Sequence, residues 1–413
     1  MKFIQHSTFN IQHFQSIQHF RGIQHLTFNI QHFLIFVFLN FCTLQSGAQS
    51  DSCTLQISLL TCSPGQELYS TFGHTAIRVK DSVTATDIVF NYGTFDDSDP
   101  YFYLKFTRGV MRYALSVQSF NDFMQEFMQE HRGVTEQILL LDCNEKMRLL
   151  HALQINAEEE NRFYNYHFYA DNCTTRARDI ISRNTSSPVV FRNILPQKHP
   201  TFRQLLHNYL DKGGQNWSKL GIDMCLGWHL DTRVTNEEAM FLPDYLMTGF
   251  DSAQLNNRPL VGEKQTVLSE PVQQKNSKTL FTPFIVFLIL FLAICVLSFV
   301  KREWSAKALR LFDGLFFLLL GLLGIFILLL WIIRIDTVCR NNLNLLWALP
   351  THLPVAFVLH KNKSWVRNYF KIVFVLNSIL IITWFILPQH LNISFIPVAL
   401  LIIFRSWFLS KKY

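Results

Sequence analysis

The sequence of 413 residues is poor in charge: Asp, Glu, Lys and Arg make up 16% of it, whereas a soluble domain usually carries ~25%. Acidic residues are scarcest near the C-terminus. Residues 301–413 contain 13 Lys and Arg and three acids, a net charge of +10 against +7 for the whole chain. The basic character therefore comes from the most apolar part of the protein. A nucleic-acid-binding face would be a basic patch on a folded polar domain, so we expect no nucleic-acid partner. The composition also excludes a wholly soluble or disordered protein.

The sequence also lacks any Cys-x-x-Cys pair, a spacing typical of zinc sites, so we expect no metal and no other cofactor. Residues 50–278 contain five cysteines, namely Cys53, Cys62, Cys143, Cys173 and Cys225. Since five is odd, one thiol is left over even if two disulfides form. We interpret Cys173 as a reactive thiol, for the reasons below, and the other four as structural.

The N-terminal residues 1–48 contain a short irregular repeat followed by an export signal. The triplet Ile-Gln-His begins at Ile4, Ile11, Ile17, Ile23 and Ile30. We interpret the repeat as low-complexity sequence without function; a histidine-rich metal tract is the alternative, but carboxylate and cysteine neighbours are missing. An apolar run at 33–41 and the small residues Ser46-Gly47-Ala48 predict a signal peptide that is cleaved after Ala48.

What the C-terminal part does contain is five apolar stretches, at about 280–300, 314–333, 343–359, 370–387 and 393–409. A membrane-spanning helix needs ~20 apolar residues, and four of the stretches fit. The third is short and is interrupted by Pro350 and Pro354. We keep it as a span because Lys and Arg concentrate in the first and third loops and in the tail, and the positive-inside rule then places all three in the cytoplasm. Five spans leave residues 49–278 outside, in agreement with the export signal.

Within the exported part, alternating apolar residues predict strands at 55–60, 75–80, 87–92, 110–117 and 137–141. Helices are predicted near 120–130 and 144–161. A further helix should begin in the sequence FYADNCTTRARDII, with Asp171 or Asn172 as its N-cap. Cys173 would then lie in the first turn, where the helix dipole and unpaired amides favour a thiolate and can stabilise an oxyanion.

A nucleophilic thiol needs a base and a group that orients the base. The best base is His74, at the start of a predicted strand in YSTFGHTAIRVKD. The next strand brings Asn91 beside it if the two strands form a hairpin, since opposed side chains then lie ~5 Å apart. A satisfied strand histidine and a turn-supporting asparagine are the alternatives for these two residues, as a buried structural thiol is for Cys173.

The order base, orienter, then Asn-Cys at a helix start is similar to the circularly permuted papain-like fold of lecithin–retinol acyltransferase. A closer resemblance links LLTCSPGQELYSTFGHTAIRV, FNYGTF, PYFYLKFTRG, FYADNCTTRARDII and MFLPDYLM to the Lnb family of Bacteroidota lipoprotein N-acyltransferases. That family ends in a five-helix membrane domain. The retinoid enzymes carry a second histidine where Asn91 stands here, so this resemblance does not extend to the residue that orients the base.

Several other polar residues are candidate contacts for substrate. Tyr69 is a candidate oxyanion donor, with aromatic packing as the alternative. Arg108 and Arg176 match the geometry of a phosphate headgroup, although salt bridges on a helix surface would also explain them. We add Asn172 to this group. Asn344 and His352 lie in the third apolar stretch, where they either line a path for lipid or pack helices together.

The resemblance implies an α+β, permuted papain-like domain at 49–270, a linker at 271–279 and an all-α five-helix transmembrane domain at 280–413. It implies an acyltransferase of the bacterial inner membrane. An acyl group would pass from a membrane phospholipid, through a thioester on Cys173, to the N-terminal amine of a diacylglyceryl-cysteine lipoprotein. Two other functions stay open: a membrane-tethered cysteine amidase acting on cell-wall peptide, and a non-catalytic membrane sensor.

Overall fold

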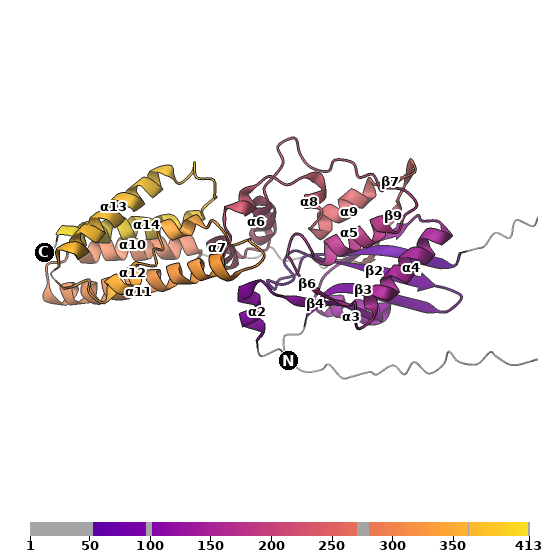
Figure 1. Cartoon of the computed structure of the whole chain (residues 1–413), viewed down its shortest axis with the longest axis horizontal. Coiled ribbons are helices and arrows are strands. Elements are labelled where there is room, and N and C mark those ends of the chain that lie inside the picture. The colour runs from indigo at the N-terminus through magenta and orange to yellow at the C-terminus, as the bar shows by residue number, and fades with distance from the viewer. Residues whose placement is uncertain (1–52, 96–100, 271–280, 362, 412–413) are drawn as a thin grey trace, which may run out of the picture. The chain divides into compact units, whose positions relative to one another are not determined.

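A computed structural model describes residues 53–95, 101–270, 281–361 and 363–411, all within one unit of the chain, Cys53–Tyr413. The N-terminal repeat, the predicted signal peptide and the predicted linker at 271–279 lie outside the described residues. The described chain is a sheet-containing part followed by a helical part with apolar helices (Figure 1).

The first part is built around an antiparallel sheet in the order β6-β4-β3-β2-β1-β5-β9. Its strands are β1 (Leu55–Cys62), β2 (His74–Asp81), β3 (Thr86–Phe95), β4 (Arg112–Ser119), β5 (Val134–Leu139), β6 (Phe163–Asn165) and β9 (Val261–Leu268). All five strands predicted from alternation are present, with ends that differ by a few residues. Strands β2 and β3 form the expected hairpin, with Ile77 opposite Phe90.

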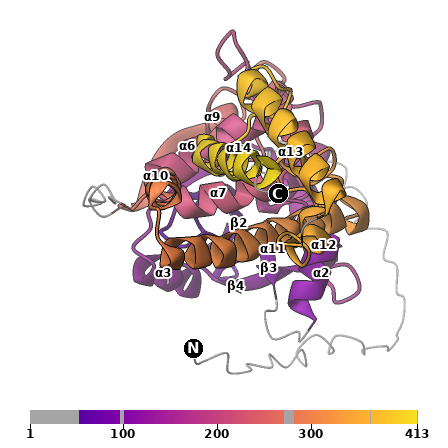
Figure 2. The same ribbon diagram turned by 90° about the vertical axis from the view of Figure 1, so that its left-hand side faces the viewer.

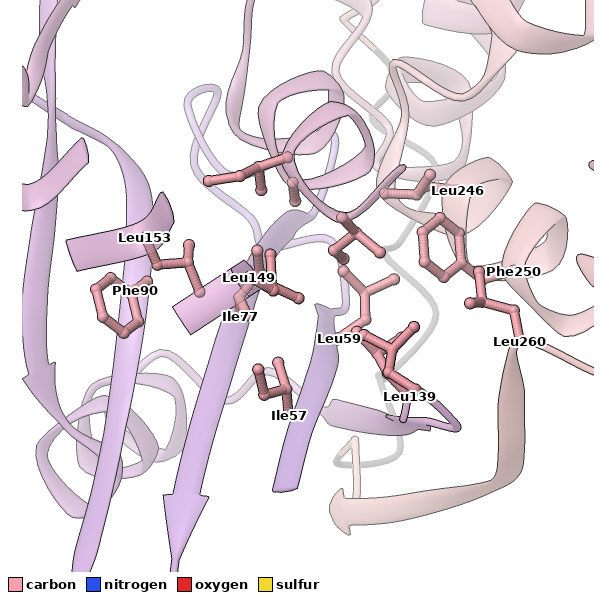
Figure 3. Close-up of a cluster of buried hydrophobic side chains, with 14 of the residues drawn as sticks. Ile57, Leu59, Ile77, Phe90, Leu139, Leu149, Leu153, Leu246, Phe250 and Leu260 are labelled. Atoms are coloured by element: carbon pink, nitrogen blue, oxygen red, sulfur yellow. The ribbon is translucent and has the colours of Figure 1, made fainter. Parts of the chain in front are cut away.

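Helices cover both faces of this sheet. Figure 1 shows α5 (Cys173–Arg183) and α9 (Pro243–Asp251) on one side and α3 (Phe120–Gln129) on the other. On the first side, Ile57, Leu59 and Ile77 of the sheet pack with side chains of α9 and of α4 (Cys143–Ala157), as Figure 3 shows. On the second side, Ala76 and Val89 pack against α3. Consecutive residues of β2, such as Ala76 and Ile77, thus enter different clusters, because successive side chains of a strand point to opposite faces of the sheet.

A smaller helical layer follows the sheet. It consists of α6 (Phe202–Lys212), α7 (Asn216–Cys225), η2 (Trp228–Asp231), α8 (Asn236–Ala239) and the two-stranded sheet of β7 (Gln254–Leu255) and β8 (Arg258–Pro259). Its apolar cluster includes Leu205, Leu230 and Phe241, together with Val338 and Cys339 from the membrane part. The short helix α2 (Phe102–Arg108) also meets the membrane part, since the Ile335 amide donates to the Arg108 carbonyl over 3.1 Å.

The helical part contains α10 (Pro283–Phe299), α11 (Glu303–Ile333), α13 (Ser364–Thr383) and α14 (Ile396–Lys411), which η4 (Ile393–Phe395) precedes. Figure 2 shows these four helices grouped together. Among the described residues, three helical segments are long and apolar enough to cross a membrane, and α10 is a shorter apolar helix of 17 residues. The first, second, fourth and fifth predicted spans are therefore helices.

The third predicted span differs from expectation because it is not a continuous helix. It forms η3 (Leu343–Leu346), a turn and α12 (His352–Ala356). Pro350 and Pro354 account for the interruption, since proline removes an amide donor and clashes with the preceding turn. The segment nevertheless runs back along α11, because His360 Nε2 lies 3.0 Å from the Arg310 carbonyl oxygen. Its other end contacts α11 at Gly324, where a Cβ would meet the Ala348 carbonyl oxygen. Arg310 and Gly324 are 14 positions apart on the helix, a rise of ~21 Å.

Candidate active site

The structure places Cys173 at the first residue of α5, as the sequence predicts. Asn172 is the N-cap: its Oδ1 accepts hydrogen bonds from the Thr174 and Thr175 amides, both over 2.9 Å. Its Nδ2 donates to the carbonyls of Phe168 and Phe241 over 2.7 and 2.9 Å. Asn172, expected to contact substrate, is thus buried and bonded to its own chain, and it fixes the start of the helix. Because Asn172 takes two first-turn amides, the amide of Cys173 is the one we consider for an oxyanion.

His74 and Asn91 meet as the hairpin predicts. Nε2 of His74 lies 2.6 Å from Asn91 Oδ1, which as an acceptor requires the proton on Nε2. The other ring nitrogen, Nδ1, is then free of that proton and available to a thiol. His74 and Cys173 also lie close enough that each shifts the pKa of the other. The three predicted residues therefore form one chain of contacts from thiol to imidazole to amide.

The surroundings of Cys173 favour its thiolate. Burial alone would raise the pKa of the thiol, but the charge and hydrogen bond of His74 lower it, helped by the Thr75 amide and the Thr174 hydroxyl. The net pKa of Cys173 is about 7. Burial would lower the pKa of His74, but the thiolate and the bonds to Cys173 and Asn91 raise it instead. The pair thus favours thiolate and imidazolium near neutral pH.

Gly93 leaves the space in which thiol and imidazole meet. The β3–β4 register shifts between Tyr92 and Thr94, which marks a β-bulge at this glycine. A Cβ there would lie 3.5 Å from Cys173 Cβ and 3.9 Å from His74 Cε1. Its φ of +97° also disfavours any other residue. The role of Gly93 cannot be predicted from the sequence, because a glycine within a strand pattern does not reveal what lies beside it.

Two tyrosines, Tyr113 and Tyr166, pack against the same apolar cluster as Cys173. Burial and then the negative charge of Cys173 raise the pKa of Tyr113 to about 12, and the same two causes raise that of Tyr166. The two rings stack with centroids 4.3 Å apart, and Phe95 lies 5.3 Å from the Tyr113 ring. We call Phe95, Tyr113 and Tyr166 the aromatic wall. An aromatic surface of this kind can contact an apolar ligand.

The remaining predicted contacts of the sheet domain are dispersed. The hydroxyl of Tyr69 donates to Glu130 over 3.3 Å, and the side chain is 68% exposed. The guanidinium of Arg176 pairs with Asp171 over 2.6 Å and lies 3.6 Å from the centre of the Tyr164 ring, so it stabilises the loop before Cys173. Arg108 is exposed at the end of α2.

Asn344 and His352 are buried and bonded within the protein. Nδ2 of Asn344 donates to the Asp223 carbonyl over 3.0 Å, and its Oδ1 accepts from the Trp347 indole over 3.0 Å. Nδ1 of His352 lies 2.8 Å from the Tyr369 hydroxyl, and Nε2 lies 3.3 Å from the Trp347 carbonyl oxygen. These bonds supply the polar partners that non-helical chain needs at membrane depth.

Helix α7 connects the sheet domain to the membrane part. Leu220 belongs to the apolar cluster of the membrane helices. Asn342 donates to the carbonyls of Met224 and Cys225 over 2.8 and 3.0 Å, and so satisfies carbonyls at the helix end that lack helical partners.

A buried ionic network strengthens this connection. Arg203, which is 1% exposed, donates to Asp223 over 2.7 Å and to Asp231 over 3.0 Å. From the membrane part, Asn392 donates to Asp223 over 2.9 Å, and His390 lies 2.9 Å from Asp231. Buried charges that are paired in this way resist separation, because removing one partner leaves the other unpaired. The sheet-containing part is therefore held against the loop before α14 by buried ion pairs and hydrogen bonds.

A thiol, an imidazole and an amide in this arrangement, in an α+β domain fixed to membrane helices, define a membrane protein with a site of the kind that acyl transfer uses. Residues 44–208 match the family model described as the Lnb N-terminal periplasmic domain, and residues 274–413 match the one described as the Lnb transmembrane domain. The chain belongs to the Lnb family and has a periplasmic domain and a transmembrane domain. No curated protein and no solved structure matches it.

The ion pair predicts how the reactivity of Cys173 depends on pH. A thiol with a lowered pKa is a thiolate above that pKa, so the rate of alkylation by iodoacetamide should rise with a midpoint near pH 7. In His74→Ala the midpoint should move up toward the ~8.5 of an ordinary cysteine. Peptide mass spectrometry of Cys173 after timed labelling would measure both. An unchanged midpoint in His74→Ala would show that the imidazole does not activate the thiol.

Proposed function

We propose that this protein is a lipoprotein N-acyltransferase of the bacterial inner membrane. It would move a fatty acyl group from a membrane phospholipid to the N-terminal amine of a diacylglyceryl-cysteine lipoprotein. The contact of Cys173 with His74 and Asn91 at a helix start carries the proposal, and membership of the Lnb family supports it. The permuted papain-like fold and the boundaries 1–48, 49–270, 271–279 and 280–413 belong to this proposal.

In the first half-reaction the Cys173 thiolate attacks the ester carbonyl of the phospholipid. The Cys173 amide hydrogen-bonds the tetrahedral oxyanion, a contact that strengthens as charge develops. The imidazolium of His74 protonates the departing alkoxide, and a lysophospholipid leaves an acyl thioester on Cys173. Asn91 keeps the imidazole in the tautomer that places Nδ1 toward the sulfur.

In the second half-reaction the lipoprotein amine replaces the lysophospholipid. Neutral His74 takes a proton from the amine as it attacks the thioester, the thiolate leaves, and an amide forms. The aromatic wall would contact the acyl chain in both steps. Tyr69 is a second candidate donor to the oxyanion, and Arg108 is a candidate contact for the donor phosphate.

Both substrates are anchored by acyl chains, which explains why the active-site domain is mounted on membrane helices. Each buried methylene contributes ~0.8 kcal/mol, so a diacyl lipid will not leave the bilayer to reach a distant site. Arg108, which touches the end of α11 through its carbonyl, and the loop before Cys173 lie toward that membrane side. The loop before Cys173 reaches that side at His167, whose imidazole lies close to Asp336.

Mass spectrometry of lipoprotein N-termini tests the proposal directly. Cells that contain the protein should carry N-acylated lipoproteins, and cells that lack it should accumulate the diacylated, free-amine form. Complementation with the native chain should restore the third acyl group. Unchanged N-termini together with altered cell-wall peptides would favour the amidase instead. Unchanged N-termini and cell wall would favour the sensor.

A further inference from the structure

A sixth cysteine lies on the periplasmic side, in the loop that follows α11. The amide of Gly227 donates to the Val338 carbonyl over 2.9 Å, which places this loop against the periplasmic domain. Cys339 is the next residue. Since Cys173 is the proposed nucleophile and must stay free, the cysteines on this side that could pair are Cys53, Cys62, Cys143, Cys225 and Cys339, in a compartment where disulfides form and persist.

The partner that the fold brings to Cys339 is Cys225, the last residue of α7. Asn342 donates to the Cys225 carbonyl over 3.0 Å, while Gly227, two residues after Cys225, binds Val338. Cys339 is a buried member of the apolar cluster of the helical layer, and Cys225 packs against that cluster. Two hydrogen bonds to backbone carbonyls, at Cys225 and at Val338, therefore hold the chain segments of the two cysteines together.

We propose that Cys225 and Cys339 form a disulfide that covalently links the periplasmic domain to the loop after α11. The oxidant is a protein or small molecule that carries a disulfide. One thiolate of the chain attacks it and forms a mixed disulfide; the other then attacks that bond and releases the oxidant as a dithiol. The chain loses two protons and two electrons, and the oxidant gains them.

The surroundings determine when this bond can form. Both cysteines are thiols in the structure, and burial raises the pKa of Cys225 to about 11 and that of Cys339 to about 12. Because the thiolate is the attacking species, the folded pair reacts slowly. Oxidation therefore belongs to the folding stage, before the loop docks, and the finished bond is shielded from reductants.

The bond would join two parts that polar contacts already hold together. The hydrogen bonds from Asn342 to the Met224 carbonyl and from Asn344 to the Asp223 carbonyl both require α7 to lie against the membrane part. A covalent link at the end of α7 would keep these contacts together while the site handles two lipid-anchored substrates. Formation of the disulfide does not depend on the reaction proposed for Cys173.

The experiment places a cleavage site for a sequence-specific protease between residues 271 and 279 of the full chain. Membranes are prepared with a thiol-blocking reagent, cleaved, and run on denaturing gels. Without reductant the two fragments should stay joined, and with reductant they should separate. Cys225→Ser and Cys339→Ser should each separate without reductant, whereas Cys53→Ser and Cys173→Ser should stay joined.

A second measurement uses the unmodified chain. Digestion of denatured, unreduced and alkylated protein should yield one species in which the peptides of Cys225 and Cys339 are joined. Separation of the native fragments without reductant, or recovery of both cysteines in alkylated form, would overturn the proposal. A link that survives in Cys225→Ser would also overturn it, because another pair would then be joined.

Discussion

Replacing Cys173 with serine should abolish lipoprotein N-acylation, with a loss of at least about 10³-fold, because removing a covalent nucleophile disables the whole site. Serine has nearly the same size, so expression and membrane insertion should not change. His74→Ala should cause a loss of the same order, since both half-reactions use its proton. Asn91→Ala should retain more activity, with a loss on the order of 10²-fold, because it misplaces the imidazole without removing it.

Timed transfer from phospholipid to a diacylated lipopeptide, in detergent or vesicles, would measure these rates. The native protein should also accumulate a hydroxylamine-sensitive acyl adduct on Cys173 when the lipopeptide is left out. Cys53→Ser is the matched control, since Cys53 is a partly buried thiol of the same domain away from His74. Normal turnover by Cys173→Ser would remove the mechanism, and an acyl adduct on a different residue would relocate it.

The sequence predicts the contacts among the proposed catalytic residues because each contact depends on short-range rules. Alternation identifies the strands of His74 and Asn91, and the short connection 82–85 makes them a hairpin. The Asp-Asn-Cys order predicts a capped helix start, and the structure has a capping box there. These rules fix which side chain lies on which element, so the sequence predicts that the thiol, the imidazole and the amide lie close together.

The features that the sequence does not predict depend on contacts between distant segments. Gly93 is recognisable as special only when Cys173 and His74 are seen on either side of it. The sequence leaves open whether Asn344 lines a path for lipid or packs helices together; in the structure it binds α7, 121 residues earlier in the chain. Likewise Asn172 contacts the Phe241 carbonyl as well as its own helix. Composition gives no information on such partners.

The third apolar stretch shows a limit of the same kind. Its prolines predict an interruption, which the structure contains; the charges of the neighbouring loops predict a crossing, which stays a prediction. Gly321 and Gly324 of α11 face the irregular chain, in positions where a Cβ would overlap Leu353 and the segment around Ala348. Close backbone approach at small residues is a common way to pack membrane helices; here it accommodates a broken one.

Substituting alanine for Gly324 should therefore disrupt the membrane domain. A Cβ at this position would overlap the Ala348 carbonyl oxygen and lie 2.7 Å from Pro350 N, both backbone atoms that cannot rotate away. Overpacking in a well-packed core typically costs ~1–3 kcal/mol, and a backbone clash belongs at or above the upper end. Gly321→Ala should behave alike, since its Cβ would overlap Leu353 N. Both variants should lower the midpoint of thermal unfolding in detergent and the yield of monodisperse protein.

Gly314→Ala is the matched control, because it lies on the same helix and its Cβ would meet no atom within 4 Å. It should leave the unfolding midpoint unchanged or slightly higher, since alanine favours helix over glycine. Equal effects of all three substitutions would contradict the packing argument and point to a general need for flexibility in α11. If Gly324→Ala alone lost N-acylation while its unfolding midpoint stayed native, the third segment would contribute to transfer itself. Loss of both together is the expected result, because the buried contacts of Asn344 and His352 place that segment in the structural core of the membrane domain.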